Sequence, residues 1–163
     1  GIALASHDDA TLAHVEEAEA DGVAIAEFPT TLEAASAAHE AGLSILMGAP
    51  NVVRGGSHNG NVSALDLISM GIGGALASDY HYPSPRRAAF MLADRGVLPL
   101  AQAWHLVSAG PATVLGLSDR GVIATGKRAD LLVLDAQTRR VALTMSGGRV
   151  SYMSGEIAAR FLR

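Results

Sequence analysis

Four short apolar runs, each followed by polar residues and then by a helical pattern, place the tightest limit on the fold of this chain. The runs predict strands at residues 2–5, 23–26, 43–46 and 74–77. Each run is apolar at consecutive rather than alternate positions, which is typical of strands covered on both faces in a parallel sheet. Because strand, loop and helix recur in this order, the sequence predicts an α/β protein whose parallel sheet is covered by helices.

The segments between the runs carry helix start and stop signals. Asp8 or Asp9 is the expected N-cap of the first helix, and Gly22 is its expected end. Thr30 and Glu33, three positions apart, fit a capping box at the start of the second helix. We therefore interpret Asp8 and Asp9 as capping residues rather than as catalytic ones.

The later part of the chain has a different pattern. An amphipathic helix is predicted at residues 99–109. After it, three apolar runs predict short antiparallel strands at residues 130–135, 141–145 and 149–152, the last two joined by a hairpin turn at Gly147-Gly148. We expect two packing units, with the boundary after residue 109.

Composition narrows the classes of function. The chain of 163 residues is 49% hydrophobic and 17% charged, which suits a folded domain and not a disordered segment. Its net charge of −4 shows no basic patch, so no nucleic-acid partner is expected. No apolar run approaches the ~20 residues that cross a bilayer, so no membrane partner is expected. The lack of cysteine excludes disulfides and thiolate metal sites and fits a cytoplasmic protein.

A long glycine-rich loop is predicted at residues 47–61, between the third strand and a helix at residues 63–70. Its glycines let backbone N–H groups approach a ligand closely. Its polar side chains add hydrogen-bond donors: Asn51, Arg54, Ser57, His58 and Asn61. Such a loop suits an anion, above all phosphate. The alternative is an ordinary surface loop with a glycine-rich turn, although loops of this length are usually functional or disordered.

Ionisable side chains recur at the ends of the predicted strands. His7, Glu27 and Asp79 each come just after an apolar run. Because the carboxyl ends of parallel strands share one rim, these side chains can converge on one site with the glycine-rich loop. His and Asp at such positions can bind a metal ion or transfer a proton. The alternative for each is a cap on the neighbouring helix, and Glu27 fits both interpretations equally.

Residues 110–135 read Gly-Pro-Ala-Thr-Val-Leu-Gly-Leu-Ser-Asp-Arg-Gly-Val-Ile-Ala-Thr-Gly-Lys-Arg-Ala-Asp-Leu-Leu-Val-Leu-Asp. This segment resembles the C-terminal signature of the amidohydrolase superfamily, in which the chain leaves a (β/α)8 barrel and returns to a small β-sandwich. Further motifs are Ala-Ser-His7-Asp8-Asp9, Ala-Glu27-Phe28-Pro29-Thr30-Thr31, Met47-Gly48-Ala49-Pro50-Asn51, Arg54-Gly55-Gly56-Ser57-His58 and Ser78-Asp79-Tyr80. Together they resemble one subfamily, the diphosphatases of phosphonate degradation.

The resemblance implies a place within the barrel. Asp79 matches the superfamily's strand-eight Asp, so the chain would supply about strands five to eight and part of the sandwich. We therefore expect the C-terminal half of the barrel at residues 1–109 and a sandwich segment at residues 110–163, within a longer protein. Half a barrel leaves open sheet edges, so we expect a homo-oligomer or self-association through these edges.

The resemblance also implies a reaction. The expected activity is a metal-dependent phosphohydrolase that cleaves a small phosphorylated substrate, a ribose triphosphate bearing methylphosphonate, to the 5-phosphate and pyrophosphate. His7 and Asp79, with Glu27 as a third candidate, would hold a divalent ion, zinc first, with manganese, iron and magnesium as alternatives. Asp79 would also take the proton of the attacking water, and His7 would share the catalytic role. Arg54, Ser57, His58, Asn51 and Asn61 would hold the triphosphate.

Two other functions remain open. One is a C–N hydrolase of the same superfamily acting on a cyclic amide, and the other is a non-catalytic α/β module that binds phosphate. The stretch from Arg54 to His58 argues against the first, because a neutral amide needs no anion cradle. A tightly bound divalent ion at His7 and Asp79 would argue against the second. Because the superfamily's other metal ligands are missing, we expect this chain alone to be inactive.

Overall fold

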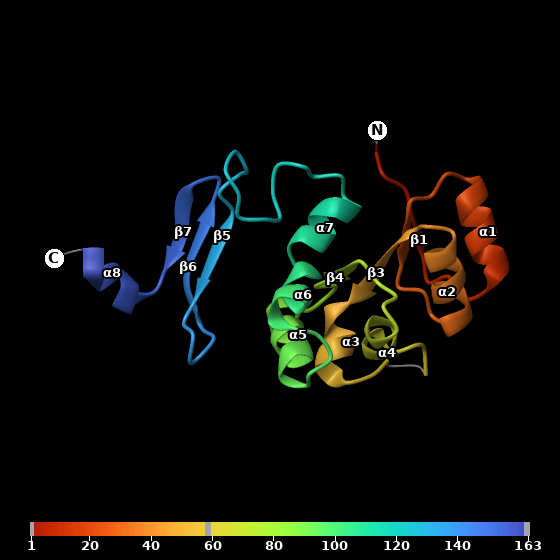
Figure 1. Ribbon diagram of the computed structural model, residues 1–163, viewed down its shortest axis with the longest axis horizontal. Helices are drawn as coiled ribbons and strands as arrows, with labels where there is room; N and C mark the ends of the chain where they lie inside the picture. The colour runs from red at the N-terminus through yellow and green to blue at the C-terminus, as the bar shows by residue number, and fades with distance from the viewer. Residues whose placement is uncertain (1, 58–59, 162–163) are drawn as a thin grey trace. The chain divides into compact units, whose positions relative to one another are not determined.

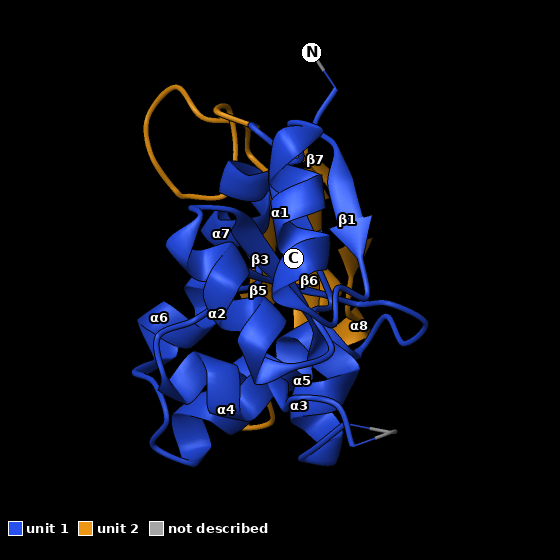
Figure 2. Ribbon diagram, turned by 90° about the vertical axis from the view of Figure 1, so that its right-hand side faces the viewer, with its two compact units in different colours: residues 1–116 blue, residues 117–163 orange. Residues whose placement is uncertain are grey.

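The computed structural model describes residues 2–57 and 60–161, and the chain divides into two compact units (Figure 2). The first unit comprises Gly1–Gly116 and the second Leu117–Arg163. The boundary expected after residue 109 therefore falls inside the first unit. None of the helices in the described ranges is long and apolar enough to cross a membrane.

The first unit is built on a four-stranded parallel sheet (Figure 1). Its strands lie side by side in chain order: β1 (Ala5–His7), β2 (Ile25–Glu27), β3 (Ser44–Gly48) and β4 (Ala75–Ala77). The predicted α/β fold with a parallel sheet is confirmed. The strands begin later than predicted, so His7 and Glu27 are the last residues of their strands rather than the first residues beyond them. Polar side chains do not interrupt a ladder, because backbone groups make its hydrogen bonds.

Strand β1 departs from the prediction that every strand is covered on both faces. Its residues Ala5 and His7 are exposed, whereas Ile25 and Ala26 in the neighbouring β2 are buried. In the sheet, β1 lies at an edge beside β2. The prediction is therefore wrong for β1. The other edge strand, β4, has Ala75 and Leu76 buried, because α7 packs on it.

Helices alternate with the strands of the first unit: α1 (Leu12–Ala20), α2 (Leu32–Glu40), α3 (Ala49–Arg54), α4 (Ala64–Ser69), α5 (Ser84–Asp94), α6 (Leu100–His105) and α7 (Ala109–Val114). Helices α1 and α2 pack side by side, and α5 packs against both α3 and α6 (Figure 1).

The core of the first unit is rich in alanine. Fully buried alanines occur in β2, β4, α2, α3, α5 and α6: Ala26, Ala34, Ala35, Ala38, Ala49, Ala75, Ala88, Ala89 and Ala103. The larger side chains of Ile45, Leu67 and Leu92 fill the remaining space. Small side chains let the helices approach the strands closely, which gives the dense packing that a stable interior requires.

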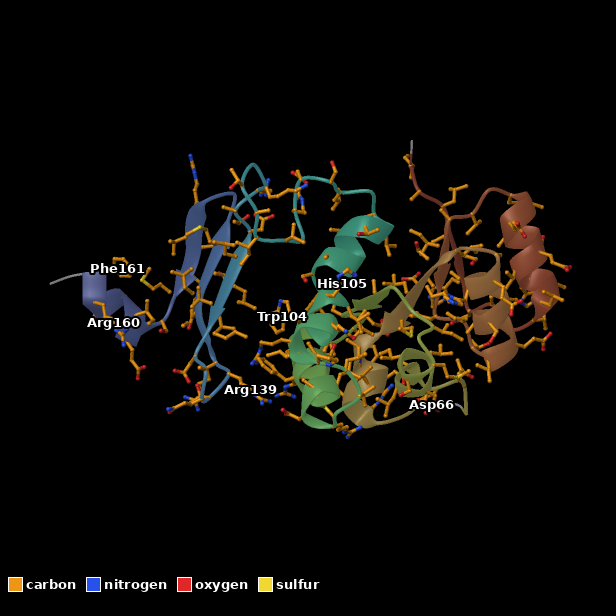
Figure 3. All side chains as sticks on the ribbon, viewed as in Figure 1. Asp66, Trp104, His105, Arg139, Arg160 and Phe161 are labelled. Carbon is orange, nitrogen blue, oxygen red and sulfur yellow. The ribbon has the colours of Figure 1, made fainter. Side chains whose placement is uncertain are left out.

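Helix α6 carries the single tryptophan of the chain. Trp104 packs against the core, with its ring edge-on to Phe90 at a centroid distance of 5.6 Å. The neighbouring His105 is exposed on the same helix (Figure 3). Trp104 is therefore a natural fluorescence reporter of the first unit.

The start of α2 differs from the predicted capping box. Thr31 is the N-cap, and its hydroxyl accepts a hydrogen bond from the Ala34 N–H at 3.1 Å. The Thr30 hydroxyl instead donates to the Asp9 carbonyl, and Glu33 accepts from the N–H at the start of α1. The predicted pairing of Thr30 with Glu33 is wrong, because the connecting loop continues for one more residue before the helix begins.

The start of α1 is also later than predicted. Thr11 is its N-cap, so neither Asp8 nor Asp9 caps this helix. Asp9 is buried and accepts a hydrogen bond from the Ser6 hydroxyl. Asp8 has a left-handed backbone with φ of 60°. The interpretation of these two residues as helix caps is therefore wrong.

The predicted glycine-rich loop contains a helix. Residues Ala49–Arg54 form α3, with Pro50 in its first turn and Gly55 at its end. Gly55 has φ of 84°, the left-handed conformation that glycine adopts most easily at a helix end. The prediction of an uninterrupted loop at residues 47–61 is wrong, and Arg54 stands on the last turn of a helix instead of on a loop.

The helix predicted at residues 99–109 is present but ends earlier, since α6 ends at His105, and the separate helix α7 was not predicted. The Leu106 carbonyl between them accepts a hydrogen bond from the Leu76 N–H of β4 at 2.7 Å. In a continuous helix that carbonyl would bond to the N–H of Gly110. Helix α7 packs on β4 and so belongs to the first unit, which explains why the boundary lies later than expected.

The second unit is a three-stranded antiparallel sheet followed by a helix: β5 (Leu131–Leu134), β6 (Val141–Ser146), β7 (Arg149–Met153) and α8 (Gly155–Phe161). The three predicted strands and their antiparallel order are confirmed. Gly147 and Gly148 between β6 and β7 have φ of 55° and 80°, as a tight hairpin turn requires. Ala142 is the one buried apolar residue among the described residues of this unit.

Candidate active site

Most of the residues proposed from the sequence line one cavity of the first unit, about 350 Å³ in volume. Its polar lining is His7, Asp8, Asn51, Arg54, Ser57, Asn61, Asp79 and Tyr80. Its apolar lining includes Phe28, Pro29, Met47, Pro50, Val62, Ala64 and Leu67. The parallel sheet explains this meeting, because segments that leave the carboxyl ends of neighbouring strands share one rim. His58 lies outside the described residues.

Three cavity residues have a left-handed backbone that side chains other than glycine rarely adopt. Asp8, Phe28 and Asp79 have φ of 60°, 55° and 49°, and each follows the end of a strand. The Asp8 N–H donates to the Glu27 carbonyl at 3.0 Å, and the Phe28 N–H donates to the Leu46 carbonyl at 2.9 Å. Such conformations cost on the order of 1–3 kcal/mol each and cluster at functional sites. They indicate that the rim is held in one geometry by its neighbours.

His7 has two acidic side chains and an aromatic ring as neighbours. Its Nδ1 is 3.2 Å from the Asp8 carboxylate, and its Nε2 is 3.9 Å from the Glu27 carboxylate. The Phe28 ring meets the imidazole nearly edge-on, with centroids 5.5 Å apart and an angle of 77° between the planes. Sequence reasoning gave Asp8 and Phe28 no role at the site. The order of residues at a strand end does not show which way each side chain turns.

Glu27 lies next to a cavity residue, His7, but not in the cavity lining. It ends β2 in register with His7 of β1. Its side chain is 31% exposed, and its carboxylate lies 3.9 Å from Nε2 of His7. Its contact at the site is therefore made through His7.

The donor side of the cavity is formed by Arg54, Ser57 and Asn61, which follow β3 in the chain. Arg54 extends from the end of α3, and its Nη1 donates to the Tyr80 hydroxyl oxygen. The guanidinium also lies over the Tyr80 ring, with Cζ 6.0 Å from the ring centroid. Sequence reasoning quoted Tyr80 in a motif and assigned it no function, because its contact partner is far away in the chain.

Asn51 has a structural contact as well as a place in the cavity. Its carboxamide oxygen accepts a hydrogen bond from the Ala64 N–H at the start of α4, at 3.0 Å. The bond links α3 to α4 and holds the chain segment between them. The carboxamide nitrogen is the part of Asn51 that can still serve the predicted role of a donor to a ligand.

A model of the amidohydrolase family matches residues 4–152. The chain belongs to the amidohydrolase family. It is 57% identical over 136 residues to the alpha-D-ribose 1-methylphosphonate 5-triphosphate diphosphatase of Escherichia coli (strain K12), covering 81% of this chain and 35% of that protein. It is 51% identical over 55 residues to an adenine deaminase of Methylobacterium sp. (strain 4-46), covering 33% of this chain and 10% of that protein.

Solved amidohydrolase structures have the same fold. The N-acetylglucosamine-6-phosphate deacetylase of Pasteurella multocida matches with a TM-score of 0.69 at 14% identity, covering 93% of this chain and 51% of that one. At this identity the match describes the fold and not the substrate. The chain spans about a third or less of the length of the curated relatives described above.

Amidohydrolases are generally metal-dependent hydrolases, so the donors at the rim can be tested against a metal ion. His7 ends β1 and Asp79 follows β4, the two outer strands of the sheet. Neighbouring strands lie about 4.8 Å apart, so backbones three strands apart are separated by on the order of 10–15 Å. Within residues 2–57 and 60–161, no three His, Asp or Glu side chains form a group that could hold a metal ion. The predicted set of His7, Glu27 and Asp79 is thus not a complete metal site by itself.

Proposed function

We propose that this amidohydrolase chain carries part of the active site of a phosphohydrolase. The proposed reaction hydrolyses alpha-D-ribose 1-methylphosphonate 5-triphosphate to the 5-phosphate and pyrophosphate. The observation that carries the proposal is the 57% identity to the E. coli diphosphatase across 81% of this chain. The cavity supports it, because donors from α3 and the following segment line it together with ionisable residues at the strand ends.

We also propose the place of the chain in the fold. The first unit would be about strands five to eight of a (β/α)8 barrel, and the second unit would be a segment of the small β-sandwich. The exposed edge of β1 supports this placement, since a closed barrel would pair that edge with another strand. In a chain that lacks such a strand, the same edge is where copies would associate.

The residues of the chain divide into two tasks in this proposal. Arg54, Ser57 and Asn61, with His58, would bind the triphosphate oxygens, since charge-assisted hydrogen bonds suit phosphate. Water would add to the phosphorus nearest the ribose, the bond from that phosphorus to the bridging oxygen would break, and pyrophosphate would leave. Asp79 would accept the proton that the water releases.

His7 and Asp79 would each contribute a donor to a metal site that residues outside this chain complete. Zinc is the first candidate, because imidazole nitrogen and carboxylate oxygen are both zinc ligands, with manganese, iron and magnesium as alternatives. Such an ion would supply Lewis acidity and offset phosphate charge. The described residues do not complete its coordination, and the tasks assigned above to Arg54 and Ser57 do not depend on it.

The test of the anion site is substitution of Arg54. Losing a charge-assisted contact costs about 1.5–3 kcal/mol, so Arg54→Ala should weaken triphosphate binding roughly ten- to a hundredfold. Arg54→Lys should recover part of the loss, because a point charge cannot reproduce the two-pronged geometry of guanidinium. Arg87→Ala is the matched control, since Arg87 is exposed on α5 and does not line the cavity.

Affinity for the substrate and metal content would be measured together by calorimetry and elemental analysis in the longer parent protein and in its three variants, because this chain alone does not complete the metal site. Unchanged triphosphate affinity in Arg54→Ala would show that the residue is structural. Loss of metal in that variant would also contradict the assignment, because the proposed metal ligands lie at the ends of β1 and β4.

A second prediction concerns the chain alone. With an incomplete set of metal ligands, the 163-residue chain should release pyrophosphate far more slowly than an ordinary enzyme, which turns over roughly once per second or faster. The measurement is pyrophosphate release with each candidate divalent ion added. Turnover near one per second would show that this chain holds a complete site.

A C–N hydrolase remains the second candidate, and the similarity to adenine deaminase over 55 residues favours it. Ammonia release from adenine or ring opening of a cyclic amide would support it, especially if Arg54→Ala left those rates unchanged. If the chain bound triphosphate tightly and its longer parent released neither pyrophosphate nor ammonia, a non-catalytic phosphate-binding module would be the better description.

A further inference from the structure

Arg54 and Tyr80 lie 26 positions apart in the chain and meet at the same cavity. Arg54 stands at the end of α3, whereas Tyr80 belongs to the segment between β4 and α5. The Arg54 Nη1 donates to the Tyr80 hydroxyl oxygen, and Cζ of Arg54 lies 6.0 Å from the centroid of the Tyr80 ring. Both contacts join the guanidinium of Arg54 to the same phenol, so Tyr80 fixes the position of one edge of the guanidinium.

The backbone before Tyr80 supports more than a chance contact between two surface residues. Asp79 has φ of 49°, a conformation that an Asp side chain adopts at a cost. The chain turns sharply there, and the next residue brings its phenol to Arg54 at the cavity. The tyrosine side chain is still 62% exposed, so burial alone does not explain its position.

We propose that Tyr80 is a positioning residue that holds the Arg54 guanidinium in the orientation required to bind the oxygens of a phosphate chain. The inference rests on the proposed anion-binding role of Arg54. A guanidinium binds two phosphate oxygens at once only when its planar fork faces them. An arginine side chain in water samples many rotamers, and ordering it costs affinity at the moment of binding. The contact with Tyr80 orders the Arg54 side chain before the anion binds, so less affinity is lost to ordering at the moment of binding.

The experiment measures the affinity of inorganic triphosphate for the chain by isothermal titration calorimetry. Four proteins make a double-mutant cycle: the wild type, Tyr80→Phe, Arg54→Ala, and the double variant. Tyr80→Phe keeps the ring and removes the hydroxyl that accepts the Arg54 hydrogen bond. A hydrogen bond of this kind corresponds to about a two- to tenfold change in affinity. We expect that loss when Arg54 is present and less than about a twofold change when Arg54 is alanine.

Tyr82→Phe is the matched control. Tyr82 is 85% exposed, lies two positions away and does not line the cavity, so its hydroxyl should not affect triphosphate binding. Circular dichroism and the Trp104 emission of each variant check that the fold is retained. Since Tyr80 is mostly exposed, removal of one hydroxyl should leave both signals unchanged.

The outcomes separate this inference from the proposed function. If Arg54→Ala weakens triphosphate binding and Tyr80→Phe does not, the inference is wrong and the anion site stands. If Tyr80→Phe weakens binding equally with and without Arg54, Tyr80 acts on the anion or the fold directly, which also overturns the positioning role. If the wild type does not bind triphosphate, or Arg54→Ala binds it normally, the anion site fails and the inference fails with it.

Discussion

In the first unit, Ile45 and Leu92 are fully buried between a parallel sheet and its helices, whereas Leu132 and Val133 of the second unit are 42% and 47% exposed on an antiparallel sheet. The second unit has polar contacts at the surface instead. Arg120 and Arg128 pair with neighbouring carboxylates at 2.8 Å. Exposed ion pairs contribute about 0–1 kcal/mol each, far less than burial of a large aliphatic side chain.

The difference explains why the candidate site is in the first unit. Three left-handed residues line its cavity, and their cost must be offset by the surrounding packing. The left-handed non-glycine residue described in the second unit is Arg139, just before β6, which lines no site described above. A unit with a dense core can keep residues in unfavourable backbone conformations at the rim of its sheet, because burial of apolar side chains offsets their free-energy cost. A sheet with one buried apolar residue gains little folding free energy to offset such a cost.

The largest expected effect is the loss of a core side chain. Leu92→Ala in α5 should destabilise the first unit by about 2–5 kcal/mol, because it removes contacts and leaves a cavity. Leu132→Ala in β5 should cost less than about 1 kcal/mol, because that side chain already meets water. Trp104 fluorescence in urea reports the first unit, and the amide signals of β5 to β7 report the second. Equal losses of unfolding free energy in the two variants would contradict the difference in packing between the two units.

The next effect concerns the close approach of α7 to β4. A Cβ at Gly110 would lie 2.2 Å from the Gly74 carbonyl oxygen, which is backbone and cannot move aside cheaply. Gly110→Ala should therefore destabilise the first unit by about 1–3 kcal/mol. Gly56→Ala is the control, because a Cβ there meets nothing within 4 Å. If the two variants melted at the same temperature, the backbone contact between α7 and β4 would be looser than described.

The smallest effect is electrostatic and belongs to the second unit. The Gly147 N–H, which donates to Asp130 at 2.7 Å, and the Arg128 side chain hold the pKa of Asp130 below its usual value. A folded-state pKa below the unfolded one stabilises the unit above the unfolded pKa, near 3.9, and this stabilisation is lost as the pH falls through the lower folded-state pKa.

Asp130→Asn should therefore lower the melting temperature of the second unit at pH 7, and the difference from the wild type should shrink below about pH 4. The measurement follows the amide signals of β5 to β7 during heating at both pH values. Glu156→Gln in α8 is the control, since it takes no part in these contacts. A difference that grew on acidification would contradict the sign of the pKa shift.

The residues of the candidate site were partly predictable. His7, Arg54, Ser57 and Asp79 were selected because they follow apolar runs or stand in a glycine-rich stretch, and the structure brings them to one cavity. Tyr80 was missed because nothing in its neighbourhood shows that its hydroxyl meets Arg54. Pattern reasoning identifies which residues follow a strand, but the direction of a side chain depends on backbone angles such as the φ of 49° at Asp79.

The sequence alone determined the parallel sheet, its strand order along the chain and the change to antiparallel strands beyond the last helices. These features depend on periodicity and turn residues, which are local. Only the tertiary structure decided that α6 ends at His105, short of the predicted residue 109, because the Leu106 carbonyl bonds to Leu76 of β4 instead of continuing a helix. It also decided that Thr11 and Thr31 cap their helices. At Leu106 a contact between segments distant in the chain outweighs a local helix preference worth about 1 kcal/mol or less per residue. The two capping bonds are local, to the His14 and Ala34 N–H groups, but the Thr30 hydroxyl bonds to the distant Asp9 carbonyl instead of capping α2.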